Sequence, residues 1–288
     1  MLYDIIIIGG GPAGCAAAVY TARKRLKTLL ITEEFGGQSL VSDDIQNWIG
    51  ETHILGFDLA KKFEEHVRAF PDMVEVKMPE RVTEVREKDA HFSIATQSGE
   101  VYETKAVVLT PGARRKKLGV PGEERLNGKG VVYCSTCDAP IFSGLTVGVV
   151  GGGNAGLEAV VDLIPYAEKI YLLEYGDAVK GDPVTFEDIK KSSKVEILYN
   201  FQTLEILGEQ MVSGIRYKNN KTNEEKELTV QGVFVEIGSV PNSEMVKNIV
   251  DLDKFGQVII DSKHGTTSHP GIFAAGDITD DPYKQNNI

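Results

Sequence analysis

Residues 4–20 read DIIIIGGGPAGCAAAVY, an apolar run that passes through a glycine-rich turn into a run of small residues. Residues 146–161 read TVGVVGGGNAGLEAVV and repeat this pattern. In each copy the spacing G-x-G-x-x-G follows an expected buried strand and opens an expected helix, which is typical of a dinucleotide-binding βαβ unit. Two such copies predict two nucleotide-binding domains in one chain.

The first motif places Gly9, Gly11 and Gly14 at its three glycine positions. The first glycine permits a tight turn, the second lets a diphosphate approach, and the third lets the helix pack on the strand. An acid that binds the ribose is expected near the end of the next strand, and Glu33 stands there, with Glu34 as the fallback. Cys15 opens the helix and is interpreted as a small buried residue rather than a nucleophile.

The second motif has Gly151, Gly153 and Gly156 at the same spacing. Glu174 follows the next apolar run, where the ribose-binding acid belongs. A carboxylate there pairs with a 2′-hydroxyl and repels a 2′-phosphate, so the motif favours NADH, with NADPH possible. The alternative is that Glu174 is only a solvated strand end.

Two cysteines form the segment CSTCD, in which Cys134 and Cys137 precede Asp138. Thiols at this spacing favour reversible redox chemistry, and an adjacent carboxyl group can move a proton as electrons arrive. A metal site is a second interpretation, although no further cysteine or paired histidine supplies the remaining ligands. The pattern also allows two unpaired structural cysteines, and it allows Asp138 to be a plain helix cap.

Two segments rich in glycine, proline or charge are expected to connect the domains, residues 112–123 and 238–242. The first domain then covers residues 1–114 and 243–288, and the second covers residues 115–242. The predicted fold is α/β, with two Rossmann-like three-layer nucleotide-binding domains, the second inserted into the first.

Composition excludes several classes of protein. The chain has 31 Lys and Arg against 42 Asp and Glu, a formal net charge of −11, which argues against nucleic-acid binding. No apolar run approaches the ~18–20 residues that span a bilayer, so no membrane association is expected. The N-terminus enters the glycine motif at once and does not resemble a signal peptide, so a cytoplasmic location is the default expectation.

With two glycine motifs flanking CSTCD, the sequence resembles the low-molecular-weight thioredoxin reductase family from about residue 3 to its last residue. Within it, the sequence is most similar to the flavoprotein subunit of alkyl hydroperoxide reductase, without the N-terminal thioredoxin-like domain. Four further segments carry the resemblance: FGGQ at 35–38, QNW at 46–48, AAGD at 274–277 and PYKQ at 282–285.

The resemblance implies FAD on the first domain and a nicotinamide nucleotide on the second. No metal is expected, because the cysteine pair has no further ligands nearby. The implied FAD residues are Gly9, Gly11, Pro12, Ala13, Gly14, Glu33, Gly37, Gln38, Asn47, Thr110, Gly112, Gly276, Asp277 and Gln285. The implied NAD(P)H residues are Gly151, Gly153, Asn154, Ala155, Gly156 and Glu174.

The resemblance also implies a route for electrons. Hydride passes from NADH to FAD, and the electrons then reduce the Cys134–Cys137 disulfide. Cys137 lies next to the flavin, Cys134 attacks the partner's disulfide, and Asp138 handles the proton. The implied partner is a thioredoxin- or glutaredoxin-like protein, and the implied assembly is a homodimer.

Two departures from the family pattern matter. The thioredoxin reductases carry a His-Arg-Arg stretch for the 2′-phosphate where this chain has Glu174, Tyr175 and Gly176, which supports NADH. The family also continues into a C-terminal helix after the residue matching Gln285, and that helix is expected to be missing here, which bears on flavin binding and dimerisation. Two different functions stay open, a ferredoxin reductase-like flavoprotein and a non-catalytic redox-sensing flavoprotein.

Overall fold

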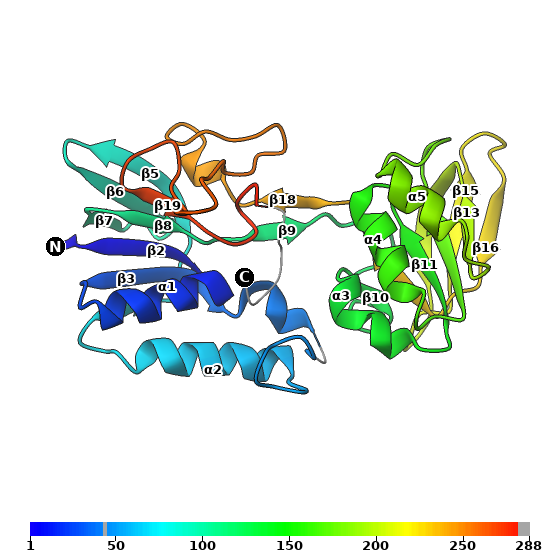
Figure 1. Ribbon diagram of the computed structural model, residues 1–288, viewed down its shortest axis with the longest axis horizontal. Coiled ribbons are helices and arrows are strands. Elements are labelled where there is room, and N and C mark those ends of the chain that lie inside the picture. Colours follow the sequence, from blue (N-terminus) through cyan, green and yellow to red (C-terminus); the bar gives the residue numbers. More distant parts are fainter. Residues whose placement is uncertain (43–44, 282–288) are drawn as a thin grey trace. The chain divides into compact units, whose positions relative to one another are not determined.

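Figure 1 shows a computed structural model of the chain, which describes residues 1–42 and 45–281. The chain divides into two compact units: unit 1 is residues 1–114 and 240–288, and unit 2 is residues 115–239. The second boundary lies slightly earlier than the expected one at 242–243. The reason is Asn242, whose backbone N–H donates to the Gly112 carbonyl at 3.0 Å and whose side-chain amide donates to the Pro111 carbonyl at 2.8 Å, both within unit 1.

Unit 1 is built on a parallel five-stranded sheet in the order β19-β8-β2-β3-β4. Its strands are β2 (Ile5–Gly10), β3 (Thr28–Phe35), β4 (Val74–Lys77), β8 (Val107–Leu109) and β19 (Ile272–Ala274). The helical elements are α1 (Pro12–Arg23), η1 (Gly37–Val41), α2 (Gly56–Arg68) and η3 (Glu244–Val246). A second sheet has the order β1-β7-β6-β5, with strands β1 (Leu2–Tyr3), β5 (Val82–Lys88), β6 (His91–Thr96) and β7 (Val101–Thr104).

Three layers form around β2 because its side chains alternate between two buried faces. Ile7 belongs to the core that α1 and α2 make with the sheet, together with Val67. Ile6 and Ile8 belong to the core on the opposite face, together with Ile94 of the second sheet. A strand buried on both faces needs no polar alternation, which explains the continuous run of isoleucines.

Unit 2 repeats this plan with a parallel five-stranded sheet in the order β10-β17-β11-β12-β13. Its strands are β10 (Val131–Val132), β11 (Thr146–Val150), β12 (Lys169–Leu173), β13 (Val195–Leu198) and β17 (Gly232–Val235). The helical elements are α3 (Ser135–Asp138), η2 (Ala139–Phe142), α4 (Asn154–Leu163) and α5 (Pro183–Ile189). An antiparallel sheet contains β14 (Phe201–Leu207), β15 (Gly214–Asn219) and β16 (Glu225–Leu228).

The same alternation gives unit 2 its layers. Val149 of β11 packs in one core with Leu157 of α4. Val150 packs in the other core with Ile206 and Ile215 of the antiparallel sheet. The connecting strands β9 (Ala113–Arg115) and β18 (Ser239–Pro241) pair with each other. Two Rossmann-like three-layer domains, the second inserted into the first, are therefore confirmed.

Candidate functional site

The first glycine motif forms a close turn between β2 and α1. Gly9 has φ +106°, and a Cβ on it would lie 2.3 Å from the Thr110 carbonyl oxygen. A Cβ on Gly14 would lie 1.9 Å from the Gly9 oxygen. The Thr110 hydroxyl donates to the Ile8 carbonyl at 2.9 Å, which ties β8 to the same turn. Glycine is therefore required at both positions for packing.

Gly11 has a different environment, because no atom lies within 4 Å of a Cβ built on it. Gly11 immediately precedes α1, whose first residue is Pro12. Two further glycines come close to this end of the helix: a Cβ on Gly37 would lie 3.4 Å from the Gly11 Cα, and a Cβ on Gly276 would lie 3.3 Å from the Ala13 Cβ. Open space beside small residues at a helix N-terminus fits a diphosphate group.

Gln38 joins two of the predicted flavin segments. Its side-chain amide donates to an Asp277 carboxylate oxygen at 3.1 Å and to the Ala113 carbonyl at 2.6 Å. Asp277 follows β19, so the structure brings the FGGQ and AAGD segments together. Gly112 has φ +66° and no atom within 4 Å of a built Cβ. Gln285 lies outside the described residues.

Glu33 and Asn47 extend this region. Glu33 is exposed near the end of β3, which runs on to Phe35. The side-chain hydroxyl oxygen of the preceding residue, Thr32, accepts a hydrogen bond from the Gly10 N–H at 2.9 Å. This contact places the end of β3 beside the glycine turn. Asn47 is partly buried in a loop closed by pairing of Ile45 with Ile54.

The second glycine motif repeats the geometry of the first. Gly151 has φ +120°, and a Cβ on it would lie 2.4 Å from the Glu236 carbonyl oxygen. A Cβ on Gly156 would lie 1.8 Å from the Gly151 oxygen. No atom lies within 4 Å of a Cβ on Gly153, which precedes α4. This unit therefore also leaves space at a helix N-terminus for a diphosphate.

Glu174 is 7% exposed, so the interpretation as a solvated strand end is wrong. One carboxylate oxygen accepts the Gly152 N–H at 2.9 Å, and the other accepts the Gly176 N–H at 2.7 Å. The carboxylate thus holds the glycine turn and the loop after β12 in place.

The loop after β12 also contacts the start of α4. The N–H groups of Lys180 and Gly181 donate to the Gly152 carbonyl at 2.9 and 3.0 Å. The Asn154 side-chain oxygen accepts the Asp182 N–H at 2.8 Å. Ala155 follows Asn154 in the first turn of α4 and is partly buried. Four predicted NAD(P)H residues therefore lie where this loop meets the helix: Gly153, Asn154, Ala155 and Glu174.

Cys134 and Cys137 form a disulfide, with Cα atoms 5.4 Å apart. Cys134 directly precedes α3, and Asp138 is the last residue of that helix and is buried. The Asp138 N–H donates to the Cys134 carbonyl at 3.1 Å, which closes the turn around the disulfide. Within the described residues, no group of three or more His, Cys, Asp or Glu side chains is placed to hold a metal ion.

Cys15 is buried, as expected for a packing residue. Its thiol donates to the Gly10 carbonyl at 3.3 Å. Burial, with a smaller contribution from the negative charge of Glu64, raises the pKa of the Cys15 thiol to about 12. Such a thiol is un-ionised at neutral pH and is a poor nucleophile.

Two acids beside the disulfide are not among the residues expected from the sequence. An Asp162 carboxylate oxygen accepts the Ser135 hydroxyl at 2.8 Å and the Thr136 hydroxyl at 3.1 Å. Glu236 is 7% exposed, and the Ser135 backbone N–H hydrogen-bonds to its carboxyl group. No sequence pattern around Asp162 predicts this contact, because Asp162 reaches the two hydroxyls only through the packing of α4. The sequence could have indicated Glu236, because this residue directly follows a buried parallel strand, and ligand-facing residues gather at such strand ends.

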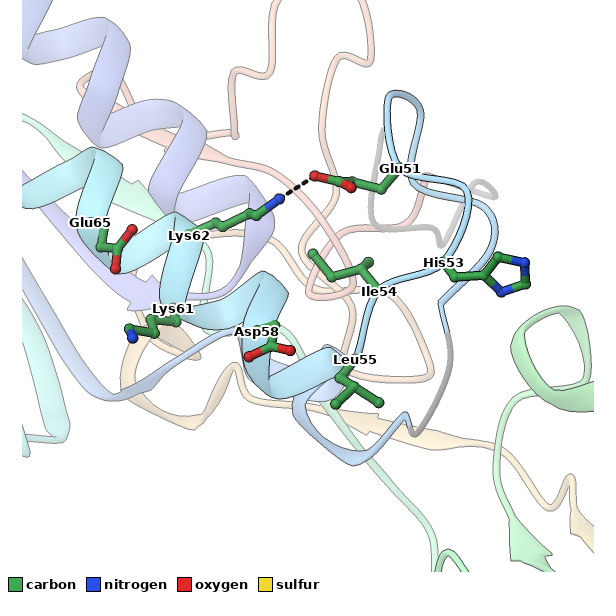
Figure 2. Close-up of a pocket in the computed structure, with 8 residues that line it drawn as sticks. All are labelled: Glu51, His53, Ile54, Leu55, Asp58, Lys61, Lys62 and Glu65. Atoms are coloured by element: carbon green, nitrogen blue, oxygen red, sulfur yellow. Dashed lines mark hydrogen bonds and ion pairs between the residues drawn. The ribbon is translucent and has the colours of Figure 1, made fainter.

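Figure 2 shows a surface pocket of about 560 Å³ near the start of α2. Its charged lining mixes three acids with three basic side chains: Glu51, Asp58, Glu65, His53, Lys61 and Lys62. Lys62 forms an ion pair with Glu51, drawn as a dashed line in Figure 2. The lining includes none of the predicted site residues in the described part of the chain.

Across the described ranges, no helix is both long and apolar enough to cross a membrane.

Sequence comparison gives relatives over nearly the whole chain. An NADH dehydrogenase of Bacillus subtilis is 43% identical over 283 residues, which are 98% of this chain and 55% of the relative. An alkyl hydroperoxide reductase protein of Pseudomonas putida is 40% identical over 285 residues, which are 98% of this chain and 54% of that protein. The chain therefore spans about half the length of these relatives.

Solved structures match the fold closely. Thioredoxin reductase from Streptococcus pyogenes has a TM-score of 0.90 and 34% identity, covering 99% of this chain and 92% of that one. Thioredoxin reductase from Giardia duodenalis has a TM-score of 0.91 and 28% identity, covering 99% and 93%. The model of the pyridine nucleotide-disulphide oxidoreductase family matches residues 3–287. With two nucleotide-type glycine turns and a cysteine pair in one fold, the chain belongs to the pyridine nucleotide-disulphide oxidoreductase family.

Proposed function

We propose that the chain passes electrons from NADH through FAD to the Cys134–Cys137 disulfide and on to a disulfide of a thioredoxin- or glutaredoxin-like protein. The observation that carries the proposal is a disulfide of C-x-x-C spacing in the same unit as an open glycine turn. A dithiol at this spacing has a use in an enzyme that reduces disulfides. It has none in a ferredoxin reductase, so the disulfide reductase is the better supported of these two functions.

The residues of unit 1 fit FAD. The space at Gly11 and the N–H groups of the first turn of α1 would hold the diphosphate. Glu33, exposed beside the same turn, would bind the ribose. Gln38 and Asp277, already hydrogen-bonded to each other, would bind the remainder of the cofactor. When bound, FAD would supply the step that converts hydride transfer into reduction of a disulfide.

The residues of unit 2 fit a nicotinamide nucleotide, and Glu174 favours NADH. Its buried carboxylate lies beside the glycine turn, where a 2′-phosphate would meet a like charge. The backbone of Lys180 is held against the same turn, but its exposed side chain is a single flexible cation. A single lysine is a weaker phosphate site than the planar fork of an arginine.

The two cysteines would divide the exchange reaction between them. A Cys134 thiolate attacks one sulfur of the partner disulfide, forms a mixed disulfide and releases the first partner thiol. Cys137 then attacks the Cys134 sulfur, restores the Cys134–Cys137 disulfide and releases the second partner thiol. Asp138, buried at the end of the same short helix, would take up and return the proton.

We propose a homodimer as the assembly, as the family resemblance implies.

An anaerobic titration tests the proposal. The chain, loaded with FAD, is titrated with NADH and separately with NADPH, in parallel with Cys137→Ser. Wild type is expected to accept about two more electrons per flavin than the variant, because a disulfide takes up two electrons. NADH is expected to bleach the flavin at lower concentration than NADPH. Equal electron uptake by wild type and Cys137→Ser would contradict the role of the cysteine pair.

A further inference from the structure

Glu236 is a buried acid to which the proposed mechanism gives no role. It directly follows β17 and is 7% exposed. Its backbone N–H donates to the Val150 carbonyl at 2.9 Å, and its carbonyl oxygen lies against Gly151. The main chain of Glu236 is therefore fixed beside the second glycine turn.

The side chain of Glu236 meets the turn that carries the disulfide. The N–H of Ser135, the residue after Cys134, hydrogen-bonds to the Glu236 carboxyl group. The hydroxyl of the same serine donates to Asp162 at 2.8 Å, and so does the Thr136 hydroxyl at 3.1 Å. Both residues between the cysteines are thus held by acids, one acid from the end of β17 and the other from α4.

The charge on Glu236 is set by burial and by its charged and polar neighbours. Burial is the main cause that raises the pKa of the carboxyl group, to about 7, and the negative charges of Asp162 and Glu158 on α4 act in the same direction. The Arg115 guanidinium of β9 and the Ser135 N–H lower the pKa and so partly oppose this. Glu236 therefore gains or loses its charge close to neutral pH.

We propose that Glu236 is a positioning residue of the redox centre, which anchors the turn between Cys134 and Cys137 and whose negative charge opposes formation of a thiolate there. The inference rests on the redox role proposed above for the disulfide. Reduction with two electrons and two protons gives two thiols, whereas reduction with two electrons and one proton gives a thiol and a thiolate. An ionised Glu236 favours the two-thiol product because two adjacent negative charges repel.

The test measures ionisation of the thiols in the full chain. Wild type, Glu236→Gln and Glu168→Gln are reduced with dithiothreitol, desalted and alkylated with iodoacetamide between pH 5 and pH 10. The rate is read by mass spectrometry on the tryptic peptide of residues 130–169, which separates these thiols from Cys15 in residues 1–23. Glu168 is an exposed acid of the same unit. Glu168→Gln is the control, because it also removes one negative charge but at a position remote from the disulfide.

The midpoint of thiol ionisation in Glu236→Gln is expected to fall by about one pH unit, since a nearby charge in a protein shifts a pKa by this order. Glu168→Gln is expected to match wild type. A midpoint in Glu236→Gln that is unchanged or raised would overturn the inference. If Glu236→Gln does not fold, the curve of Cys137→Ser decides, because that variant leaves Cys134 as the one thiol of the peptide. Coupling to Glu236 broadens this curve beyond a single-group titration, and a curve that fits one group overturns the inference.

The measurement also separates this inference from the proposed function. It uses neither nucleotide, flavin nor partner protein, so failure of the reductase activity leaves the thiol titration readable. Conversely, equal electron uptake by wild type and Cys137→Ser would refute the reductase without changing the midpoint of Glu236→Gln.

Discussion

The carboxylate of Glu174 accepts the backbone N–H of Gly152 at 2.9 Å. Its second oxygen accepts the Gly176 N–H at 2.7 Å, so one side chain holds two backbone segments of the predicted nucleotide site. The acid expected to select the ribose is therefore also part of the support of the glycine turn. Replacing it is expected to change both stability and nucleotide choice.

Glu174→Gln tests this double role. The amide can accept only one of the two N–H groups and turns its NH₂ toward the other, which costs about 1–3 kcal/mol of stability. The kcat/KM for NADH is expected to fall about tenfold and that for NADPH less, so the ratio moves toward NADPH. Asp177→Asn, an exposed acid of the same loop, is the control and is expected to leave the ratio unchanged. An equal fall for both nucleotides would show that Glu174 has a structural role alone.

Two alanine variants separate packing from cofactor binding in unit 1. Gly14→Ala places a methyl group 1.9 Å from the Gly9 oxygen, and its melting temperature is expected to fall by about 10 °C. Gly11→Ala meets no atom within 4 Å and has a backbone that alanine adopts easily, so the melting temperature of the flavin-free protein is expected to change little. Its FAD dissociation constant, measured by fluorescence quenching, is expected to rise at least about tenfold because the methyl group occupies the diphosphate position. Normal FAD affinity in Gly11→Ala would place the cofactor elsewhere.

Gly153→Ala makes the matching test in unit 2. No atom lies within 4 Å of the added methyl group, so the fold is expected to be retained. FAD content is expected to equal that of wild type, while the KM for NADH rises about tenfold. A variant that lost FAD and kept its KM for NADH would reverse the assignment of the two cofactors to the two units.

Asp138→Asn tests proton handling at the disulfide. Asp138 is buried at the end of the short helix that begins after Cys134. Removing a general acid–base typically slows the dependent step by about 10²-fold or more. Reduction of a disulfide substrate is therefore expected to slow by this factor, while flavin bleaching by NADH in the stopped-flow instrument keeps its rate. Slowing of both steps together would indicate a structural defect.

Glu236 also makes stability depend on pH. Burial raises the pKa of its carboxyl group from 4.5 in the unfolded chain to about 7 in the folded one, so the folded state binds more protons between these values. Stability is therefore expected to fall as pH rises from about 4.5 to about 7, by roughly 3 kcal/mol at most. Glu236→Gln, which does not titrate, is expected to melt at a higher temperature than wild type at pH 8. If the melting temperatures of the two proteins changed with pH in parallel, Glu236 would not be the group responsible for the pH dependence.

Much of the architecture follows from local pattern. A glycine turn between a buried strand and a helix has few conformations open to it, because Gly9 and Gly151 need positive φ, and Gly14 and Gly156 leave no room for a Cβ. The run Ile5–Ile8 indicates a strand buried on both faces, and the structure has one there. The spacing of Cys134 and Cys137 similarly allows a disulfide within one turn, which the structure contains.

The surroundings of the disulfide could not be inferred along the chain. Ser135 meets Asp162, 27 residues later, and Glu236 at the end of another strand, and these contacts exist only because α4 and β17 pack in the same core. The burial of Glu174 is likewise a result of folding, because a position at the end of a strand does not by itself determine how much of the side chain water can reach. Backbone geometry is encoded over a few residues, whereas the charge state of a buried acid depends on every element that removes it from water.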